Sequence, residues 1–349
     1  MKIVSAASAF PKNLYPQQSI TGALTNLWRD HLKNPAVLDR LHANCGVAQR
    51  HLVLDLEAYE QVKTFGQANN VWIEAAQELG EAAICKAVRS AKIELSSIAA
   101  FFFVSVTGVA SPSIDARLVN RMRLSRSIKR IPIFGLGCVA GAAGIARAAD
   151  YVRAFPDQVA VLLSVELCSL NWQRDDLSTA NLIAAGLFGD GAGAVIVAGE
   201  DTNLQGVQII ATRSSFYPDT EDVMGWDISE QGFRLVLSPT VPDVIRRYLR
   251  SDVDNFLAEH GLSRDDISSW IIHTGGPKVL QAVEYALELP SSALEASWSS
   301  LKQVGNLSSA SVLVVLEDFL KNRRGALGTY SLLAAMGPGF CSELVLLRW

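Results

Sequence analysis

The chain has 349 residues, of which 49% are hydrophobic and 19% charged, and its net charge is −4. This length suits two domains or one duplicated domain with a large core, and the composition excludes a disordered chain. The slightly acidic balance argues against a nucleic-acid-binding protein.

The five cysteines lie far apart in the chain, and no two of them have the spacing of a metal site. Their odd number and wide separation predict reduced thiols in a cytoplasmic protein without a metal. Residues 1–10 lack the layout of a signal peptide. No apolar run reaches the ~18–20 residues of a membrane span, so we expect none.

The first half of the chain alternates apolar runs with helical patterns. Strands are predicted at 2–7, 99–106, 131–134, 158–166 and, after a Gly-rich turn, within 187–198. Helices are predicted at 17–41 with an interruption at Pro35, at 71–92 and at 114–122. Strands that are apolar throughout indicate a buried, mostly parallel sheet with helices on both sides.

The second half repeats this order of elements. A strand at 270–273 followed by Gly275 matches the earlier strand followed by Gly108, and a further strand is predicted at 326–335. Gly108 precedes Cys138 by 30 positions, and Gly275 precedes Asn306 by 31. We interpret this pattern as an internal duplication, whose halves (1–200 and 201–349) meet where a site would form. An amphipathic helix is predicted at 243–257, after a loop that carries Trp226.

The stretch GLGCVAGAAG places Cys138 between a strand and a helix. Gly135 and Gly137 flank a tight turn, and an Ala-rich segment that favours helix follows. The dipole at the start of a helix favours negative charge and would lower the pKa of a thiol, which makes it a better nucleophile. The alternative is that Cys138 is a small core residue.

His273 and Asn306 are expected to meet Cys138 at the interface of the halves. Each has an alternative role, since His273 could be a satisfied core histidine and Asn306 a helix N-cap. Together, the three types suit acyl transfer with carbon–carbon bond formation. The thiolate would hold an acyl group, and protonated His273 would stabilise that thiolate as an ion pair. The Asn306 amide would donate to an enolate oxygen.

Several short motifs follow one another along the chain in the order that is typical of one enzyme family. They are GLGCVAGAAG around Cys138, LFGDGAGAVIV at 187–197, HTGGPKVL at 273–280, VGNLSSASVL at 304–313 and GPGF at 337–340. Together they resemble the type III polyketide synthases, which are chalcone-synthase-like enzymes of the thiolase superfamily. Residues 224–238 look most like the bacterial members.

The resemblance implies an α/β fold with five αβαβα layers, built from two duplicated halves, and a homodimer. It also implies iterative decarboxylative condensation of malonyl-CoA onto an acyl-CoA starter held on Cys138, followed by cyclisation to a pyrone- or resorcinol-type ring. The CoA thioesters would be used directly, with no cofactor. The alternatives are a ketosynthase III-like enzyme that makes one condensation, and a non-catalytic acyl-binding homologue.

The resemblance also assigns roles to single residues. Cys138 matches the acyl-carrying nucleophile, and His273 and Asn306 match the pair that promotes malonyl decarboxylation. Phe188 matches a gatekeeper between the CoA tunnel and the cavity, and Leu235 stands near the place of a second gatekeeper phenylalanine. Residues implied in CoA binding are Arg50, Lys278, Gly275 and Gly276. Positions implied to line the cavity are Val106, Thr107, Cys168, Trp226, Ser308, Gly337, Pro338 and Gly339.

Trp226 stands where the plant enzymes have glycine, which predicts a different cavity shape. On the sequence alone, Trp226 could equally be a packing residue.

Overall fold

The computed structural model describes residues 1–32 and 34–349. Its strands in the first half are β1 (Lys2–Ala9), β2 (Asn13–Pro16), β3 (Gln49–Leu52), β4 (Ile98–Val104), β5 (Lys129–Ile133), β6 (Val159–Leu167) and β7 (Asp190–Ala198). The helices there are α1 (Gln17–Leu27), α2 (Pro35–Ala43), α3 (Phe65–Ala91), α4 (Ile114–Arg121), α5 (Ala140–Ala154) and α6 (Thr179–Leu187).

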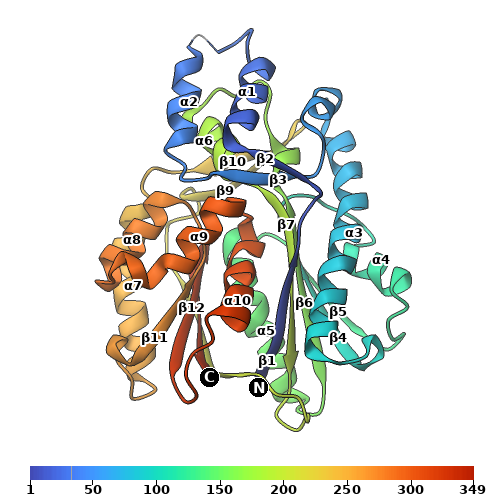
Figure 1. The fold of residues 1–349 in the computed structure, drawn as a ribbon, viewed down its shortest axis with the longest axis vertical. Coiled ribbons are helices and arrows are strands. Elements are labelled where there is room, and N and C mark those ends of the chain that lie inside the picture. The colour runs from blue at the N-terminus through green and yellow to red at the C-terminus, as the bar shows by residue number, and fades with distance from the viewer. Residues whose placement is uncertain (33) are drawn as a thin grey trace.

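The second half contains the strands β8 (Val207–Phe216), β9 (Met224–Ser229), β10 (Gly232–Leu237), β11 (Ile267–Ile272), β12 (Tyr330–Gly337) and β13 (Cys341–Arg348). Its helices are α7 (Val241–Ala258), α8 (Pro277–Leu287), α9 (Glu295–Val304) and α10 (Ser311–Asn322). Figure 1 shows the two halves side by side, with both chain termini at the same end of the molecule.

A nine-stranded sheet runs through both halves in the order β11-β12-β13-β8-β1-β7-β6-β4-β5. In the first half β4 and β6 are parallel, and β7 and β1 follow antiparallel. The strands β11, β12, β13 and β8 repeat these directions in the second half. The halves join through two residue pairs of β1 and β8. This repeat agrees with the predicted duplication, while the boundary at 200 and 201 remains a prediction.

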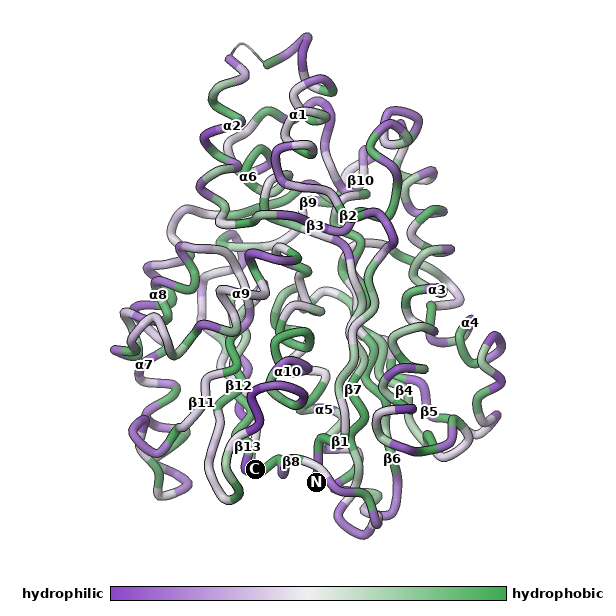
Figure 2. The backbone as a smooth tube through the Cα atoms, in the orientation of Figure 1, coloured by the Kyte–Doolittle hydropathy of each residue, from purple (hydrophilic) through white to green (hydrophobic). Residues whose placement is uncertain are grey.

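The side chains of the strands alternate between two cores. On β4, Phe102 packs in the core around α5 and α10, whereas Phe101 packs in the core under α3. On β11, Ile271 and Trp270 divide in the same way between the central core and the core under α7 and α8. Figure 2 shows hydrophobic residues concentrated in the central strands and α5. The predicted five-layer αβαβα arrangement is confirmed.

The predicted interruption at Pro35 is the beginning of α2. Pro35 occupies the first position of this helix, and the Asn34 side chain caps it by accepting from the Ala36 N–H at 3.1 Å. Proline suits that position because the missing N–H would have no partner within the helix.

The segment around Trp226, predicted as a loop, is the hairpin of β9 and β10. Trp226 lies directly opposite Leu235 in this hairpin. The prediction was wrong: Gly225 and Gly232 lie within the paired strands, and the turn of the hairpin falls at residues 230 and 231 between them.

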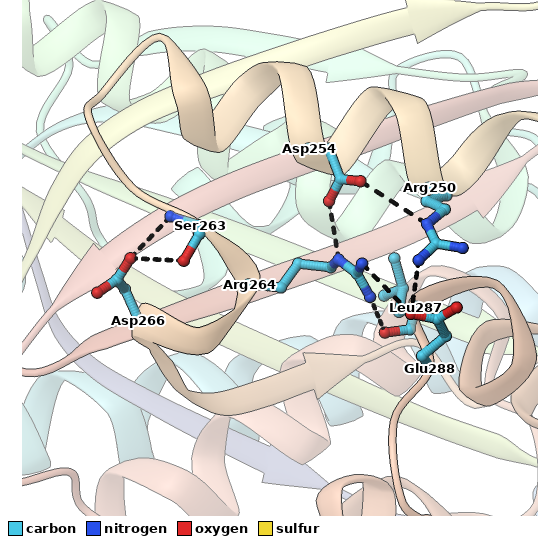
Figure 3. Close-up of polar contacts among 7 residues, drawn as sticks. All are labelled: Arg250, Asp254, Ser263, Arg264, Asp266, Leu287 and Glu288. Carbon is cyan, nitrogen blue, oxygen red and sulfur yellow. Dashed lines mark hydrogen bonds and ion pairs between the residues drawn. The ribbon is translucent and has the colours of Figure 1, made fainter.

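Ion pairs fasten α7 to the end of α8 at the outer surface (Figure 3). Arg264 lies 2.8 Å from Asp254 and 3.6 Å from Glu288, and it donates to the Leu287 carbonyl. Arg250 contacts the same two carboxylates. Because the charges share partners, the network is worth more than an isolated surface pair.

All five cysteines are unpaired thiols. Within residues 1–32 and 34–349, no helix is both long and apolar enough to cross a membrane. The same residues contain no cluster of three or more side chains suited to holding a metal ion.

Candidate active site

Cys138 lies in the short 3-10 helix η3 (Gly137–Val139), directly before α5. Gly137 has a φ of +54°, and a Cβ there would approach Pro338 to 2.7 Å, so the turn requires glycine. The Cys138 residue is 7% exposed, and its Sγ lies 3.7 Å from the Oγ of Ser308. The predicted placement of Cys138 between a strand and a helix is confirmed.

Asn306 lies in the loop before α10. Its Oδ1 accepts from the Ser308 N–H at 2.8 Å and from the Ser311 Oγ at 3.2 Å. These bonds form an Asx-type turn and fix the amide, so that its NH2 group is left for a ligand. The N-cap of α10 is Ala310, so the alternative role of Asn306 as a cap of that helix is wrong.

His273 follows the last residue of β11, and its backbone N–H donates to the Ala334 carbonyl at 3.0 Å. The ring is buried, and neither of its nitrogens has a hydrogen-bond partner among the described residues. A buried polar group without a partner calls for an explanation. The alternative of a satisfied core histidine is therefore not what the structure shows.

The close approach of α5 to the start of α10 sets the spacing between Cys138 and Asn306. A Cβ on Gly141 would meet the main-chain oxygen of Ser309 at 2.2 Å and the Val312 side chain at 2.7 Å. The two elements therefore touch through main-chain atoms, and a larger residue at 141 would push them apart.

Cys138, His273 and Asn306 line the same cleft, whose empty space is about 630 Å³ including solvent at its mouth. Other residues expected at the site that also line it are Val106, Phe188, Trp226, Leu235, Gly275, Ser308 and Pro338. Sequence reasoning missed the remaining wall, formed by Gly137, Leu187, Met224, Gly225, Leu237, Val241, Ile245, Val279, Met336 and Phe340. The alternation of residues along β9 and β10 could have revealed part of it.

Burial controls the protonation of both titratable groups in the cleft. It raises the pKa of the Cys138 thiol to about 12, although hydrogen bonds from Ser308 and Asn306 act in the opposite direction. It lowers the pKa of His273 to about 4. The predicted lowering of the thiol pKa is wrong for the free protein, because loss of solvent outweighs the helix dipole. Both shifts favour the neutral forms, so burial alone does not support the predicted ion pair in the free protein.

Replacing His273 by glutamine should remove a pH dependence of stability. Because the pKa of His273 falls from 6.5 to about 4 on folding, only the unfolded chain is protonated between these values. The contribution of the neutral His273 ring to the free energy of unfolding is complete above pH 6.5. About 3 kcal/mol of the free energy of unfolding is lost as the pH falls toward 4. In urea unfolding, the difference in free energy of unfolding between wild type and His273→Gln should shrink by that amount over this pH range. An unchanged difference between wild type and His273→Gln across this pH range would contradict the prediction.

Thr107 and Cys168 are buried and are not among the residues that line the cleft. The Thr107 hydroxyl donates to Glu166 Oε2 at 2.8 Å and accepts from the Leu167 N–H at 3.0 Å. Glu166 also accepts from the backbone N–H of Val106 at 3.1 Å. Thr107 thus holds a buried carboxylate that anchors the wall, and Cys168 is a buried neighbour of the same region.

The loop Gly337-Pro338-Gly339 contributes to the cleft through Pro338 alone. A Cβ on Gly337 would meet the Val139 backbone nitrogen at 2.6 Å, so this glycine allows the loop to approach η3. Gly339 has a φ of +127°, which favours glycine. Both glycines therefore shape the loop, and their expected role in substrate binding stays a prediction.

The residues implied in CoA binding are divided by the structure. Gly275 lines the cleft, Gly276 adopts a φ of +120° before α8, and Lys278 is exposed in the first turn of that helix. Arg50 is 0% exposed, and its guanidinium donates to Gln17 and to the Phe188 carbonyl. This placement does not fit the expected pairing with CoA phosphates, because the group does not face solvent.

Residues 2–201 match the family model for the N-terminal domain of chalcone and stilbene synthases, and residues 208–349 match the model for their C-terminal domain. The chain belongs to the chalcone and stilbene synthase family. Within this family it is 50% identical to the 1,3,6,8-tetrahydroxynaphthalene synthase of Streptomyces peucetius subsp. caesius, over 99% of this chain and 93% of that protein. It is 35% identical to the phloroglucinol synthase of Pseudomonas fluorescens, over 97% of each.

A solved structure of the chalcone and stilbene synthase type has nearly the same fold. The crystal structure of 1,3,6,8-tetrahydroxynaphthalene synthase from Streptomyces coelicolor, a bacterial type III polyketide synthase, matches with a TM-score of 0.95 at 31% identity. The match covers 100% of this chain and 99% of that one.

The chain is therefore a type III polyketide synthase, an acyltransferase that forms carbon–carbon bonds. Chalcone and stilbene synthases of this type use acyl-CoA and malonyl-CoA and need no further cofactor. This finding favours the polyketide synthase over the ketosynthase III-like and non-catalytic alternatives.

Proposed function

We propose that this enzyme builds a polyhydroxylated aromatic ring from malonyl-CoA alone, with malonyl-CoA as both starter and extender. The relatives are named for tetrahydroxynaphthalene and phloroglucinol. These products carry hydroxyls on alternating carbons and no alkyl chain, which is the pattern that two-carbon units leave. The proposal thus replaces the expected pyrone or resorcinol with a ring hydroxylated on alternating carbons. The observation that carries it is the convergence of Cys138, His273 and Asn306 on one apolar cleft.

Cys138 would act as the nucleophile that carries the growing chain. Its sulfur attacks the thioester carbonyl, the bond to the CoA sulfur breaks, and CoA leaves as a thiol. The neutral thiol must lose its proton during this step, and the neutral, unpartnered imidazole of His273 is a base in the same cleft. The reaction would then form the ion pair only when the substrate is bound.

Asn306 would stabilise the enolate that forms when malonyl-CoA loses carbon dioxide. The electron pair of the broken C–C bond moves onto the thioester oxygen, and the amide NH2 of Asn306 donates to it. The enolate carbon then attacks the acyl carbonyl on Cys138, and the bond to Sγ breaks. The bonds from Ser308 and Ser311 to Oδ1 hold the amide in the orientation that this step needs.

The apolar wall would control what happens to the extended chain. Met224, Trp226, Leu235 and Leu237 of the hairpin line the cleft together. Such a wall excludes water, so that a reactive chain with many carbonyls closes on itself instead of being hydrolysed.

The test is incubation with malonyl-CoA alone, and in parallel with acyl-CoAs from acetyl to stearoyl, followed by mass spectrometry of products. We expect an aromatic product made of several malonyl units without any added starter. Products that appear only when an acyl-CoA is supplied, or that contain a single malonyl unit, would contradict the proposal.

Trp226→Gly is expected to broaden the range of accepted starters. Removing the indole enlarges the cleft opposite Leu235, and we expect longer acyl-CoAs to enter the products at rates raised about tenfold or more. The measurement is the product profile over the acyl-CoA series. Trp298→Gly, which changes a tryptophan outside the cleft wall, is the matched control. An unchanged profile for Trp226→Gly would make this residue a packing residue.

The homodimer and the cytoplasmic location also belong to this proposal. Support for a dimer comes from β5, which is the outermost strand of the sheet and is followed by Phe134, 52% exposed. An edge strand beside an exposed aromatic ring is a surface that proteins commonly cover. The five unpaired cysteines support a reducing compartment.

A further inference from the structure

A buried pair of side chains holds the main chain that carries Phe188. Arg50 of β3 donates from Nη1 to the Phe188 carbonyl and from Nε to Gln17 Oε1 at 3.1 Å. Gln17 in turn donates from Nε2 to the Gly186 carbonyl at 2.8 Å. The Gln17–Arg50 pair therefore fixes two carbonyls of the segment 186–188.

Asn306 binds the Leu187 carbonyl, which lies between the carbonyls of Gly186 and Phe188 in the chain. Its backbone N–H donates to the Leu187 carbonyl at 2.9 Å, and its own carbonyl accepts from the Gly189 N–H at 2.9 Å. Phe188 and Asn306 form an isolated parallel β-bridge. The segment 186–189 thus has the Gln17–Arg50 pair on one side and the loop of Asn306 on the other.

The stem of Arg50 is packed tightly between these segments. A Cβ on Gly305 would meet the Leu187 oxygen at 2.7 Å and the Arg50 Cδ at 3.0 Å. A Cβ on Gly189 would meet the Val304 oxygen at 2.5 Å. Main chain lies against main chain here, so a displacement of the Phe188 segment would be passed to Asn306.

The charge of Arg50 is not explained by stability. Burial lowers the pKa of this residue to about 10, so it stays protonated at neutral pH. Among the described residues, Arg50 Nη2 has no hydrogen-bond partner, and the buried carboxylate of Asp190 acts on the guanidinium without a direct hydrogen bond. A buried charge with one unpartnered nitrogen and no directly bonded carboxylate is costly, and an apolar side chain of the same length would often be as stable.

We propose that Arg50 is a positioning residue for the condensation, because it fixes the Phe188 segment and through it the place of Asn306. The inference rests on the proposed function, since it concerns the step in which the Asn306 amide meets the enolate. Cys138 belongs to η3 and α5, outside this segment, so loading of the acyl group does not depend on Arg50.

The test compares Arg50→Met and Arg50→Lys with wild type. Methionine keeps the packed stem without the donors, and lysine keeps the charge and a donor. We expect kcat for Arg50→Met to fall about 10- to 100-fold with KM changed less than about threefold, and Arg50→Lys to recover part of it. Acylation of Cys138, followed by the mass of its peptide, should stay within about threefold of wild type.

A second substrate separates this role from CoA binding. The kcat loss should be the same with malonyl-CoA and with the malonyl thioester of N-acetylcysteamine, which has no phosphates. Arg264→Met is the matched control, because Arg264 also holds a main-chain carbonyl (Figure 3) but lies outside the cleft wall. It should lower stability without changing kcat.

Hydrogen exchange tests the positioning without any turnover. In Arg50→Met, peptides that contain the Gly189 and Asn306 N–H groups should exchange about tenfold faster or more, while peptides from α7 should not change. Unchanged exchange there would overturn the proposal, as would a loss confined to malonyl-CoA or a fall in Cys138 acylation equal to the fall in kcat. An inactive wild type would overturn the proposed function instead, and the exchange result would still decide the role of Arg50.

Discussion

Cys138→Ala is expected to abolish product formation, with turnover reduced about a thousandfold or more. Without the sulfur, no covalent acyl-enzyme can form, and the enolate has no acyl group to attack. The change removes only one buried atom, so the fold should persist with a loss of about 1 kcal/mol. The measurement is product formation from malonyl-CoA, together with the mass of the peptide that contains residue 138.

The control for this variant is Cys85→Ala, which changes a partly buried thiol on α3. It should keep both the activity and the acylated Cys138 peptide. Product formation by Cys138→Ala at a rate similar to wild type would exclude Cys138 as the nucleophile. An acyl group found on another cysteine of wild type would move the role to that residue.

Asn306→Asp is expected to lower the rate of condensation about 100- to 1,000-fold. The aspartate can keep the bonds that Oδ1 accepts from Ser308 and Ser311, so the loop should hold its shape. Its second oxygen then replaces the NH2 group, and a negative charge faces the oxygen on which the enolate charge develops. The repulsion should slow the decarboxylation of malonyl-CoA and leave the loading of Cys138 unaffected.

Two rates measured together decide this prediction. Release of carbon dioxide from malonyl-CoA should fall with condensation, while acylation of Cys138 should stay within about threefold. The exposed Asn120→Asp, which adds the same charge on α4, should change neither rate. If acylation fell as far as decarboxylation, Asn306 would act in loading or in folding instead.

The layered fold could be predicted because its cause is local and repeated. Apolar runs mark the strands, the spacing from Gly108 to Cys138 returns from Gly275 to Asn306, and the directions of the strands repeat in the same way. The convergence of Cys138, His273 and Asn306 followed from that repeat. The hairpin that holds Trp226 was missed, because the segment was interpreted as a loop although its residues pair as β9 and β10.

Protonation and burial could not be predicted from the pattern. A position before a helix indicates a field that favours a thiolate, but the loss of solvent around Cys138 depends on packing from both halves. The burial of Arg50 could not be predicted for the same reason, because a basic residue on a short strand is usually interpreted as a surface group. Its contacts with Gln17 and Phe188 involve residues distant in sequence, which no local pattern reveals.

The contact at Gly141 has a consequence for how such an enzyme can be altered. The spacing between Cys138 and Asn306 is set by main-chain atoms, which no side-chain substitution in the wall moves. Part of the cleft wall, in contrast, consists of side chains on the hairpin of β9 and β10. Substitutions in the hairpin can therefore reshape part of the cleft without altering the main-chain contact between α5 and the start of α10.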